Sequence, residues 1–402
     1  MRTILLVTVG RSDWGIYLPL IRELNQTAGI RVCVLAGGMH HVREYGLTIS
    51  EVRQEFCGPI MELEFLLASD SPESIAKSLG LGIISFSQAY KSCPADILLL
   101  LGDRYEMFAA AVAALPYQIP VAHIHGGELT LGAMDDALRH SITKLSHLHF
   151  VATQEYGRRV IQLGEEPWRV IVSGAPALDG IAKFQPMPRE DFFRVVNLPS
   201  SSEFLLVTYH PVTTEYNQTE YHIKELLRAL EMVNMPVVFT APNADTESQV
   251  IRRHLLDYCQ KHTEARYLAH CGVPLYYNAM HYAAAMVGNS SSGLIEAPSF
   301  RLPVINIGTR QAGRVRAANV VDVGYSHQEI VAAIHRVLDP RFRASLRNLT
   351  NPYGDGHASQ RIASVLSTIP LDGHLLRKGF FDLPISAITS NKELISLLSH
   401  AA

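Results

Sequence analysis

Short apolar runs alternate with longer amphipathic segments along most of this chain, and this alternation limits the possible folds more than any other feature. Runs such as TILLVTV, RVCVLAG and ADILLLLG are separated by segments such as IYLPLIRELNQ, which have helical periodicity. Strands that are apolar on both faces indicate a parallel sheet with helices on both sides. The pattern therefore predicts a doubly wound α/β fold.

The alternation occurs twice. It pauses at residues 183–203, which are rich in proline, serine and charge, and restarts with FLLVTYH and MPVVFTAP. The chain has 402 residues, which exceeds the roughly 250–300 residues at which a single core stops growing. We predict two tandem Rossmann-like domains, residues 1–185 and 186–370, followed by a C-terminal tail, residues 371–402.

Composition narrows the classes of partner. Hydrophobic residues make up 48% of the chain and charged residues 18%, as expected for a globular protein. The 35 basic and 38 acidic residues give a net charge of −3 without a long run of either sign, which argues against nucleic-acid or membrane-surface binding. The five cysteines are scattered and have no C-x-x-C spacing, so we expect a cytoplasmic location. No apolar run approaches the roughly 18 residues of a transmembrane helix.

Polar motifs follow the predicted strands. In doubly wound sheets, ligands bind beyond the carboxyl ends of the strands. In the first half these positions hold GRSD, GGMHH, GDRYE and HIHGGE, and in the second half YHPVTT, APNAD, GNSSSG and IGTRQ. We therefore predict a ligand-binding cleft between the two domains.

The segment VGNSSSGLIEA favours a phosphate site in the second domain. It combines a strand, a turn of small residues and a helix start, where free N–H groups and the hydroxyls of Ser290 and Ser291 suit a phosphate. An ordinary serine N-cap is the alternative, but Arg310 at the next strand end favours a diphosphate. Glu296 could accept hydrogen bonds from ribose or lie on a solvated helix face. The absence of G-x-x-x-x-G-K-[ST] and G-x-G-x-x-G argues against ATP hydrolysis and nicotinamide binding.

The segment HIHGGE allows three interpretations. His123 and His125 share one face of a strand, a spacing found in metal sites, with Asp103, Glu128 or His140 as further ligands. Either histidine could instead be a buried, hydrogen-bonded core residue. The third interpretation, an acid/base cluster without metal, is the one that we favour.

The ordered motifs GRSDWG, GGMH, LGDRYE, HIHGGE, DDALRHSITKLSHLH, HPVTT, PNAD, GNSSSG, INIGTRQAGR and YGDGHAS resemble the hydrolysing UDP-N-acetylglucosamine 2-epimerases, from residue 2 to about residue 367. The resemblance implies the GT-B architecture of two Rossmann-like domains. It implies conversion of UDP-N-acetylglucosamine to UDP and N-acetylmannosamine for sialic acid synthesis, or of a UDP-diacetamido-trideoxy sugar for legionaminic acid. It also implies a homo-oligomer, a dimer or tetramer, that needs no cofactor.

The resemblance also implies site residues. Uridine and diphosphate would contact the second domain at His210, Asn243, Ser290, Ser291, Glu296 and Arg310, with Arg11 reaching across from the first domain. The catalytic positions carry over as Asp103 and Asp135. One position departs, because relatives read HIEGGE with a catalytic first Glu, whereas this chain has His125. We hypothesise that His125 takes over proton transfer, with Glu128 as the alternative, since imidazole titrates near pH ~6.5.

The expected chemistry is elimination of UDP to a glycal, followed by hydration, with proton transfers at carbon 2. A GT-B glycosyltransferase and a non-hydrolysing epimerase are competing interpretations, and a nucleotide-sugar sensor is a third. Release of free UDP and free sugar without an acceptor separates the hydrolysing enzyme from all three.

Overall fold

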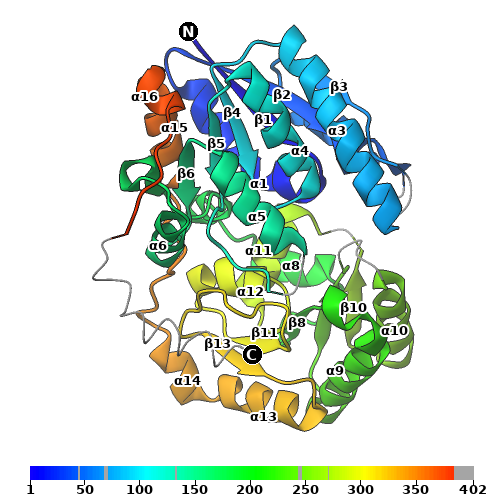
Figure 1. Ribbon diagram of the computed structural model, residues 1–402. Helices are drawn as coiled ribbons and strands as arrows, with labels where there is room; N and C mark the ends of the chain where they lie inside the picture. The colour runs from blue at the N-terminus through cyan, green and yellow to red at the C-terminus, as the bar shows by residue number, and fades with distance from the viewer. Residues whose placement is uncertain (44–45, 68–70, 132–133, 243–246, 270, 384–402) are drawn as a thin grey trace, which may run out of the picture.

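The computed structural model describes residues 1–43, 46–67, 71–131, 134–242, 247–269 and 271–383. Two parallel sheets form the centres of two α/β layers, which lie one above the other in Figure 1. Every strand pairing within the two sheets is parallel. The predicted fold of two doubly wound domains is confirmed.

The first sheet has seven strands in the order β3-β2-β1-β4-β5-β6-β7. In chain order the strands are β1 Arg2–Thr8, β2 Ile30–Gly37, β3 Ile60–Leu63, β4 Ile97–Leu101, β5 Val121–Ile124, β6 Leu148–Val151 and β7 Val170–Val172. Every residue of the apolar strand β4 is buried, as expected for a central parallel strand.

Helices cover both faces of this sheet. They are α1 Arg11–Gln26, α2 Ile49–Glu55, α3 Pro72–Ser92, α4 Tyr105–Ala114, α5 Met134–Leu145, α6 Gln154–Gln162 and α7 Ala177–Ala182. The helix α1 packs Trp14, Tyr17 and Leu20 into the core on one face, and α3 packs Phe86 and Tyr90 into the core on the other. Both predicted faces of the sheet are thus filled.

The second sheet has six strands in the order β10-β9-β8-β11-β12-β13. The strands are β8 Leu205–Thr208, β9 Val237–Thr240, β10 Ala265–Leu268, β11 Ala285–Gly288, β12 Val304–Ile307 and β13 Val320–Val323. Its helices are α8 Arg189–Val195, α9 Thr219–Val233, α10 Ser248–Lys261, α11 Gly272–Tyr282, α12 Ser292–Ile295, α13 His327–Leu338 and α14 Pro340–Ser345.

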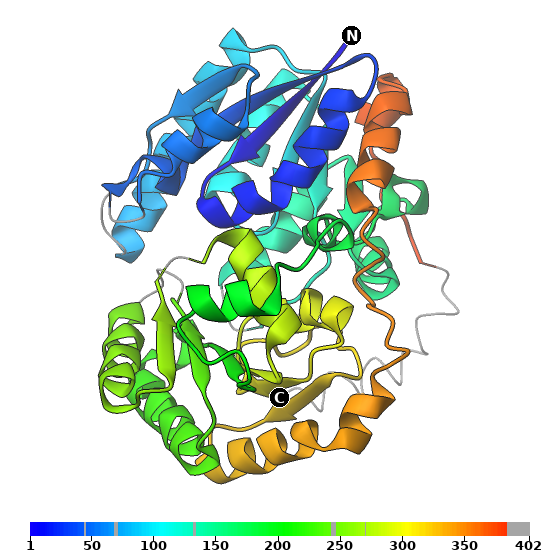
Figure 2. The same ribbon diagram turned by 180° about the vertical axis from the view of Figure 1, so that it is seen from behind.

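The end of the described chain returns to the first domain. The helices α15, Ala358–Thr368, and α16, Gly373–Leu376, lie beside the first layer in Figures 1 and 2. The carboxylate of Asp179 accepts hydrogen bonds from the first two N–H groups of α15, at 2.9 and 2.6 Å. Residues Ile362, Leu366 and Leu375 join the core around α1. Packing therefore places residues 358–376 with the first domain, whereas the sequence interpretation assigns most of them to the second domain and the rest to the tail.

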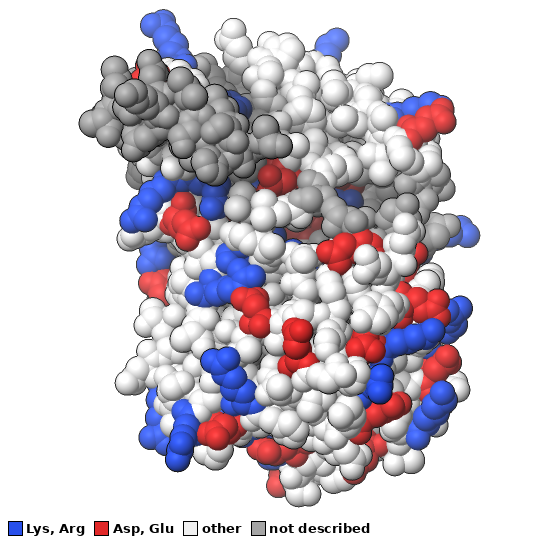
Figure 3. Space-filling view, turned by 60° about the horizontal axis from the view of Figure 1, so that its bottom comes forward, with Lys and Arg blue, Asp and Glu red and all other residues white. Residues whose placement is uncertain are grey.

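The surface carries charges of both signs. On the face shown in Figure 3, basic and acidic side chains are interspersed. Within the described part of the chain, no helix combines the length and the apolar character needed to cross a bilayer.

Candidate active site

Four side chains proposed for acid/base chemistry lie at neighbouring strand ends of the first domain. Asp103 follows β4, His125 follows β5, Glu128 lies in the turn after β5, and Asp135 lies in the first turn of α5. Because β4 and β5 are adjacent parallel strands, their carboxyl ends lie at one edge of the sheet. The sheet therefore brings these residues from separate sequence motifs to one place.

The buried guanidinium of Arg139 contacts residues at both strand ends. It forms an ion pair with Asp103, and its Nη1 donates to the carbonyl oxygen of His125 at 2.8 Å. Its Nη2 also donates to the hydroxyl of Thr130 at 3.2 Å. Arg139 lies one helical turn after Asp135, so α5 supplies both an acid and the cation that fixes the two strand ends.

His125 and Glu128 form a buried hydrogen-bonded pair. The Nδ1 of His125 lies 2.6 Å from Oε1 of Glu128, and the two residues are 7% and 2% exposed. His125 adopts a φ of +67°, a left-handed conformation in which histidine is enriched among non-glycine residues. At Gly127, φ is +77° and a Cβ would lie 2.4 Å from the carbonyl oxygen of Tyr156, so this turn requires glycine. The tight turn thus directs Glu128 back onto His125.

The charges around Glu128 stabilise its carboxylate. Burial alone would raise the pKa of Glu128, but the adjacent His125, Arg314 and Arg139 outweigh it and lower the pKa to about 2. Glu128 is therefore ionised at neutral pH. An ionised carboxylate on Nδ1 orients the imidazole and leaves Nε2 as the second reactive position of the ring.

Asp135 has the opposite electrostatic environment. Burial, reinforced by the charge of Asp103, raises the pKa of Asp135 to about 6, although Arg104 and Arg139 act against the shift. A carboxyl group that titrates near neutrality can both give and take a proton. The cluster thus combines an oriented imidazole with a carboxylic acid of raised pKa.

His123 is a core residue rather than a ligand. Its Nε2 lies 2.7 Å from the carbonyl oxygen of Gly102 and its Nδ1 lies 3.2 Å from the hydroxyl of Thr143. Burial lowers the pKa of His123 to about 3, so the ring is neutral. Among the residues that the structure describes, no group of three or more His, Cys, Asp or Glu side chains is arranged to hold a metal.

In the second domain, Asn289 connects the proposed nucleotide-binding segments. The backbone N–H of His210 donates to Oδ1 of Asn289 at 2.7 Å, and Nδ2 of Asn289 donates to the carbonyl oxygen of His210 at 2.8 Å. The carbonyl oxygen of Asn289 accepts from Arg310 at 3.2 Å and from Gln311 at 2.9 Å. Burial, together with the charge of Arg310, holds the pKa of His210 well below its usual range. The ends of β8, β11 and β12 are thus joined through the side chain and the backbone of one residue, Asn289.

The serine-rich turn follows β11. Gly288 has a φ of +141°, and a Cβ there would lie 2.0 Å from the carbonyl oxygen of Thr208, so only glycine fits where β11 meets β8. The hydroxyl of Ser290 lies 2.7 Å from that of Ser292, and Ser291 precedes the short helix α12. Glu296 ends this helix, and burial raises its pKa to about 7.

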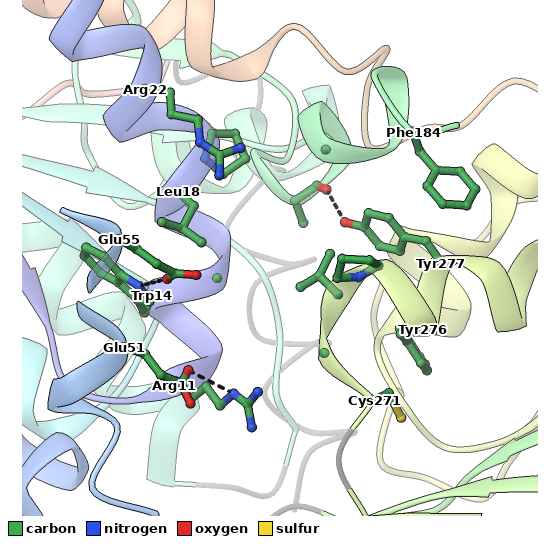
Figure 4. Close-up of a pocket in the computed structure, with 17 residues that line it drawn as sticks. Arg11, Trp14, Leu18, Arg22, Glu51, Glu55, Phe184, Cys271, Tyr276 and Tyr277 are labelled. Carbon is green, nitrogen blue, oxygen red and sulfur yellow. Dashed lines mark hydrogen bonds and ion pairs between the residues drawn. The ribbon is translucent and has the colours of Figure 1, made fainter. Parts of the chain in front are cut away.

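Arg11 lines a cavity between the domains. Figure 4 shows it at the start of α1 with its guanidinium directed to the side that faces α11. Its Nε lies 3.3 Å from Oε2 of Glu51. The cavity measures about 670 Å³, within the range of pockets that hold small ligands. Residues from both domains form its walls, among them Trp14, Arg22, Cys271, Tyr276 and Tyr277. The proposed ligand Asn243 lies outside the described residues.

Sequence reasoning missed two arginines. Arg139 lies in DDALRH, and its i,i+4 spacing from Asp135 was visible, but the spacing alone did not show that it would bind Asp103. Arg314 lies in GTRQAGR, where the preceding Arg310 drew the phosphate assignment. Its Nη1 lies 3.7 Å from Oε2 of Glu128 in the other domain, a contact between residues 186 positions apart that only the fold creates.

Comparisons with known proteins agree with this architecture. The family model for UDP-N-acetylglucosamine 2-epimerase matches residues 22–367. A Campylobacter jejuni protein named GDP/UDP-N,N'-diacetylbacillosamine 2-epimerase (hydrolyzing) is 38% identical over 95% of this chain and 99% of its own length. The Legionella pneumophila UDP-N,N'-diacetylbacillosamine 2-epimerase (hydrolyzing) is 36% identical over 94% of this chain and 99% of its own length.

Solved structures share the fold. The crystal structure of UDP-GlcNAc 2-epimerase from Neisseria meningitidis bound to UDP-GlcNAc superposes with a TM-score of 0.79 at 21% identity, covering 91% of this chain and 99% of that one. The family match spans most of the chain, and both of these relatives exceed 30% identity over nearly all of it. The chain therefore belongs to the UDP-N-acetylglucosamine 2-epimerase family.

Proposed function

We propose that this chain is a hydrolysing 2-epimerase that converts a UDP-2-acetamido sugar to UDP and the free manno-configured sugar. The observation that carries the proposal is the acid/base cluster at the ends of β4 and β5. In it, Arg139 fixes Asp103 and the backbone of His125, Glu128 orients the imidazole, and Asp135 titrates near neutrality. Such a set supplies the proton donors and acceptors that epimerisation at carbon 2 requires.

We propose a UDP-2,4-diacetamido-trideoxy sugar as the preferred substrate. The names of the C. jejuni and L. pneumophila relatives, both above 35% identity, specify diacetylbacillosamine. UDP-N-acetylglucosamine is the second candidate, supported by the ligand named for the N. meningitidis structure. The C. jejuni name also includes GDP, so the nucleotide has to be tested together with the sugar.

The first step in this proposal breaks the bond from carbon 1 to the diphosphate. Developing oxocarbenium character at carbon 1 acidifies the hydrogen on carbon 2, and a base removes it as UDP leaves, which gives a 1,2-glycal. His210, the Ser290–Ser291 turn and Arg310 would stabilise the leaving diphosphate, with Arg11 approaching from the first domain. Glu296 and Asn243 would contact the uridine part.

The second step returns a proton to carbon 2 on the opposite face, and water adds at carbon 1. We assign the two proton transfers to His125, oriented by Glu128, and to Asp135, because these are the oriented imidazole and the carboxyl of raised pKa. Asp103, held by Arg139, would orient the attacking water. No metal or cofactor takes part in this scheme.

The resemblance to the family adds two features to the proposal, a homo-oligomer of two or four chains and a cytoplasmic location. Light scattering on the purified protein and cell fractionation test them. The nucleotide sugar is the only partner that the proposal requires.

The test is proton NMR of the purified protein in heavy water with a chelator present. Separate tubes hold the UDP- and GDP-linked diacetamido sugars and UDP-N-acetylglucosamine. We expect free nucleotide and a manno product carrying deuterium at carbon 2 in at least one UDP tube. A product that stays attached to UDP would indicate a non-hydrolysing epimerase, turnover only with an acceptor would indicate a glycosyltransferase, and an intact substrate would indicate a sensor.

The role of His125 has its own test. His125→Ala should lower kcat by roughly 10²–10⁴-fold, the usual contribution of one general acid/base group. Near-normal turnover of this variant would reject the assignment and move the proton transfer to Glu128.

A further inference from the structure

The segment between β12 and β13 contacts both halves of the proposed active site. Near its start, Arg310 and Gln311 donate to the carbonyl oxygen of Asn289 in the nucleotide-binding half. Three residues later, Nε of Arg314 donates to the carbonyl oxygen of Leu129 at 3.2 Å, in the first domain. One short segment therefore joins the proposed diphosphate-binding residues to the turn that carries the acid/base pair.

Two buried tyrosines fix this segment against the first domain. The hydroxyl of Tyr156 accepts from the N–H of Val315 at 3.0 Å, and the hydroxyl of Tyr353 donates to the carbonyl oxygen of Val315 at 2.9 Å. The two hydroxyls lie 2.9 Å apart, and neither tyrosine is exposed. Tyr156 belongs to α6 of the first domain, so the backbone next to Arg314 is held at the domain interface.

Arg314 contacts the face of Glu128 that His125 does not use. The Oε1 atom of Glu128 pairs with His125, whereas Oε2 lies 3.7 Å from Arg314 and 3.9 Å from Arg139. Arg139 belongs to the first domain, so its contact with Glu128 does not depend on the position of the second domain. Arg314 comes from the second domain, so its charge reaches Glu128 only when the two domains are docked.

We propose that Arg314 is a positioning residue that completes the acid/base pair when the second domain docks. Its guanidinium lies beside Oε2 of Glu128, so that Oε1 stays on Nδ1 of His125 and Nε2 is directed to the reaction. Since Arg310 and Gln311 lie in the same segment, nucleotide binding and the orientation of the imidazole are linked. This inference rests on the proposed function but concerns a residue that the proposed scheme does not assign.

The test compares Arg314→Gln and Arg314→Lys with the wild type. In metal sites, loss of the residue that orients a metal-ligating side chain commonly costs roughly 10–100-fold in activity. We expect a kcat decrease of similar size for Arg314→Gln, because Arg314 acts on the imidazole through Glu128. The UDP Kd, measured by calorimetry, should change less than about twofold, because Arg310 and the serine turn remain. Arg314→Lys should recover part of kcat, since it restores a cation beside Glu128 but not the fork that also reaches Leu129.

The pH profile separates positioning from a general loss of structure. Loss of one cation near the cluster favours the protonated form of its acid/base groups, so the acid limb of kcat/KM should move to higher pH in Arg314→Gln. Arg343→Gln, which breaks an exposed ion pair with Glu203 in the second domain, is the matched control and should leave both kcat and the profile unchanged. An unchanged kcat and profile in Arg314→Gln, or a loss confined to UDP affinity, would overturn the proposal.

A measurement without turnover keeps the test independent of the substrate. In protein labelled with ¹⁵N-histidine, the His125 signals are identified by their loss in His125→Gln. We expect the neutral His125 ring of the wild type to carry its proton on Nδ1, and this preference to weaken in Arg314→Gln. An identical tautomer in both proteins would overturn the proposal even if none of the tested sugars were a substrate, whereas a shifted tautomer without turnover would point to an error in the substrate alone.

Discussion

The buried carboxylate of Glu128 allows a quantitative prediction for Glu128→Gln. Its side chain is 3% exposed and faces His125, Arg314 and Arg139. Its pKa falls from the ordinary 4.5 to about 2, and at about 1.4 kcal/mol per pH unit this corresponds to a contribution of about 3 kcal/mol. A neutral amide cannot replace this contribution and leaves the cations around it without a counter-charge. We therefore expect Glu128→Gln to lose up to about 3 kcal/mol of first-domain stability at pH 7.

The assay is urea unfolding followed by tryptophan fluorescence. The chain contains two tryptophans, Trp14 and Trp168, and both lie in the first domain, so the signal reports on the domain that holds Glu128. The contribution is fully present above pH 4.5, the unfolded value, and is lost as pH falls towards the folded pKa of about 2. The difference between wild type and variant should therefore shrink over this interval.

The control is Glu203→Gln, which removes an exposed carboxylate paired with Arg343 and should change stability by less than about 0.5 kcal/mol. Equal stability of Glu128→Gln and the wild type at pH 7 would refute the electrostatic argument. A stability difference that does not depend on pH would show that packing, and not charge, is responsible.

Asp135, Gly288 and the proposed independence from metal ions can each be tested separately. Asp135→Asn should lower kcat by roughly 10²–10⁴-fold. The folded pKa of Asp135 is raised to about 6, so the ionised carboxylate destabilises the folded protein above that pH. Asp135→Asn should therefore melt at an equal or higher temperature than the wild type at pH 8. A lower melting temperature of the variant would contradict this expectation. Gly288→Ala should prevent folding of the second domain, because its Cβ would lie 2.0 Å from the Thr208 carbonyl oxygen. Gly80→Ala, where a Cβ would have no atom within 4 Å, should instead stabilise α3. Circular dichroism and limited proteolysis distinguish the two outcomes. A chelator should leave turnover unchanged in the NMR assay, and recovery on addition of a divalent metal would return His123 and His125 to a metal site.

The sequence predicted the fold well because fully buried parallel strands are visible as apolar runs. β4 and β5 were both expected, and both are buried along their whole length. The edge strands β3 and β13 were missed, since they have four residues each, are only partly buried and contain a charged residue. The return of α15 to the first domain was also missed, because its amphipathic pattern shows that one face is buried but not against which domain. That information resides in contacts such as the Asp179 cap, 179 and 180 residues away in sequence.

The candidate site was predictable as far as strand positions and family motifs allow, but its contacts between distant elements were not. The resemblance pointed to Asp103 and Asp135, and the strand-end motif HIHGGE pointed to His125. Topology brings the ends of the parallel strands β4 and β5 to one edge of the sheet. The pairing of His125 with Glu128 depends on the left-handed turn at His125 and on Gly127, and a motif does not show side-chain direction. Arg139 and Arg314 were missed for a related reason: each acts on a residue from another element, at a distance that one sequence does not reveal.

The resemblance to the family implies a carboxylate at the position of His125, and an imidazole there changes the charge of the pair. In a relative reading HIEGGE, two carboxylates would occupy the positions of His125 and Glu128, and one of them would have to hold a proton if they came within hydrogen-bond distance. Here the imidazole takes that place, so the pair combines one ionised carboxylate with one ring that can carry the proton at either nitrogen. Arg314 places a charge from the second domain beside this pair, 3.7 Å from Oε2 of Glu128. In the proposed mechanism this exchange is not conservative, because it moves a proton transfer from a carboxyl group to a ring that is hydrogen-bonded to Glu128.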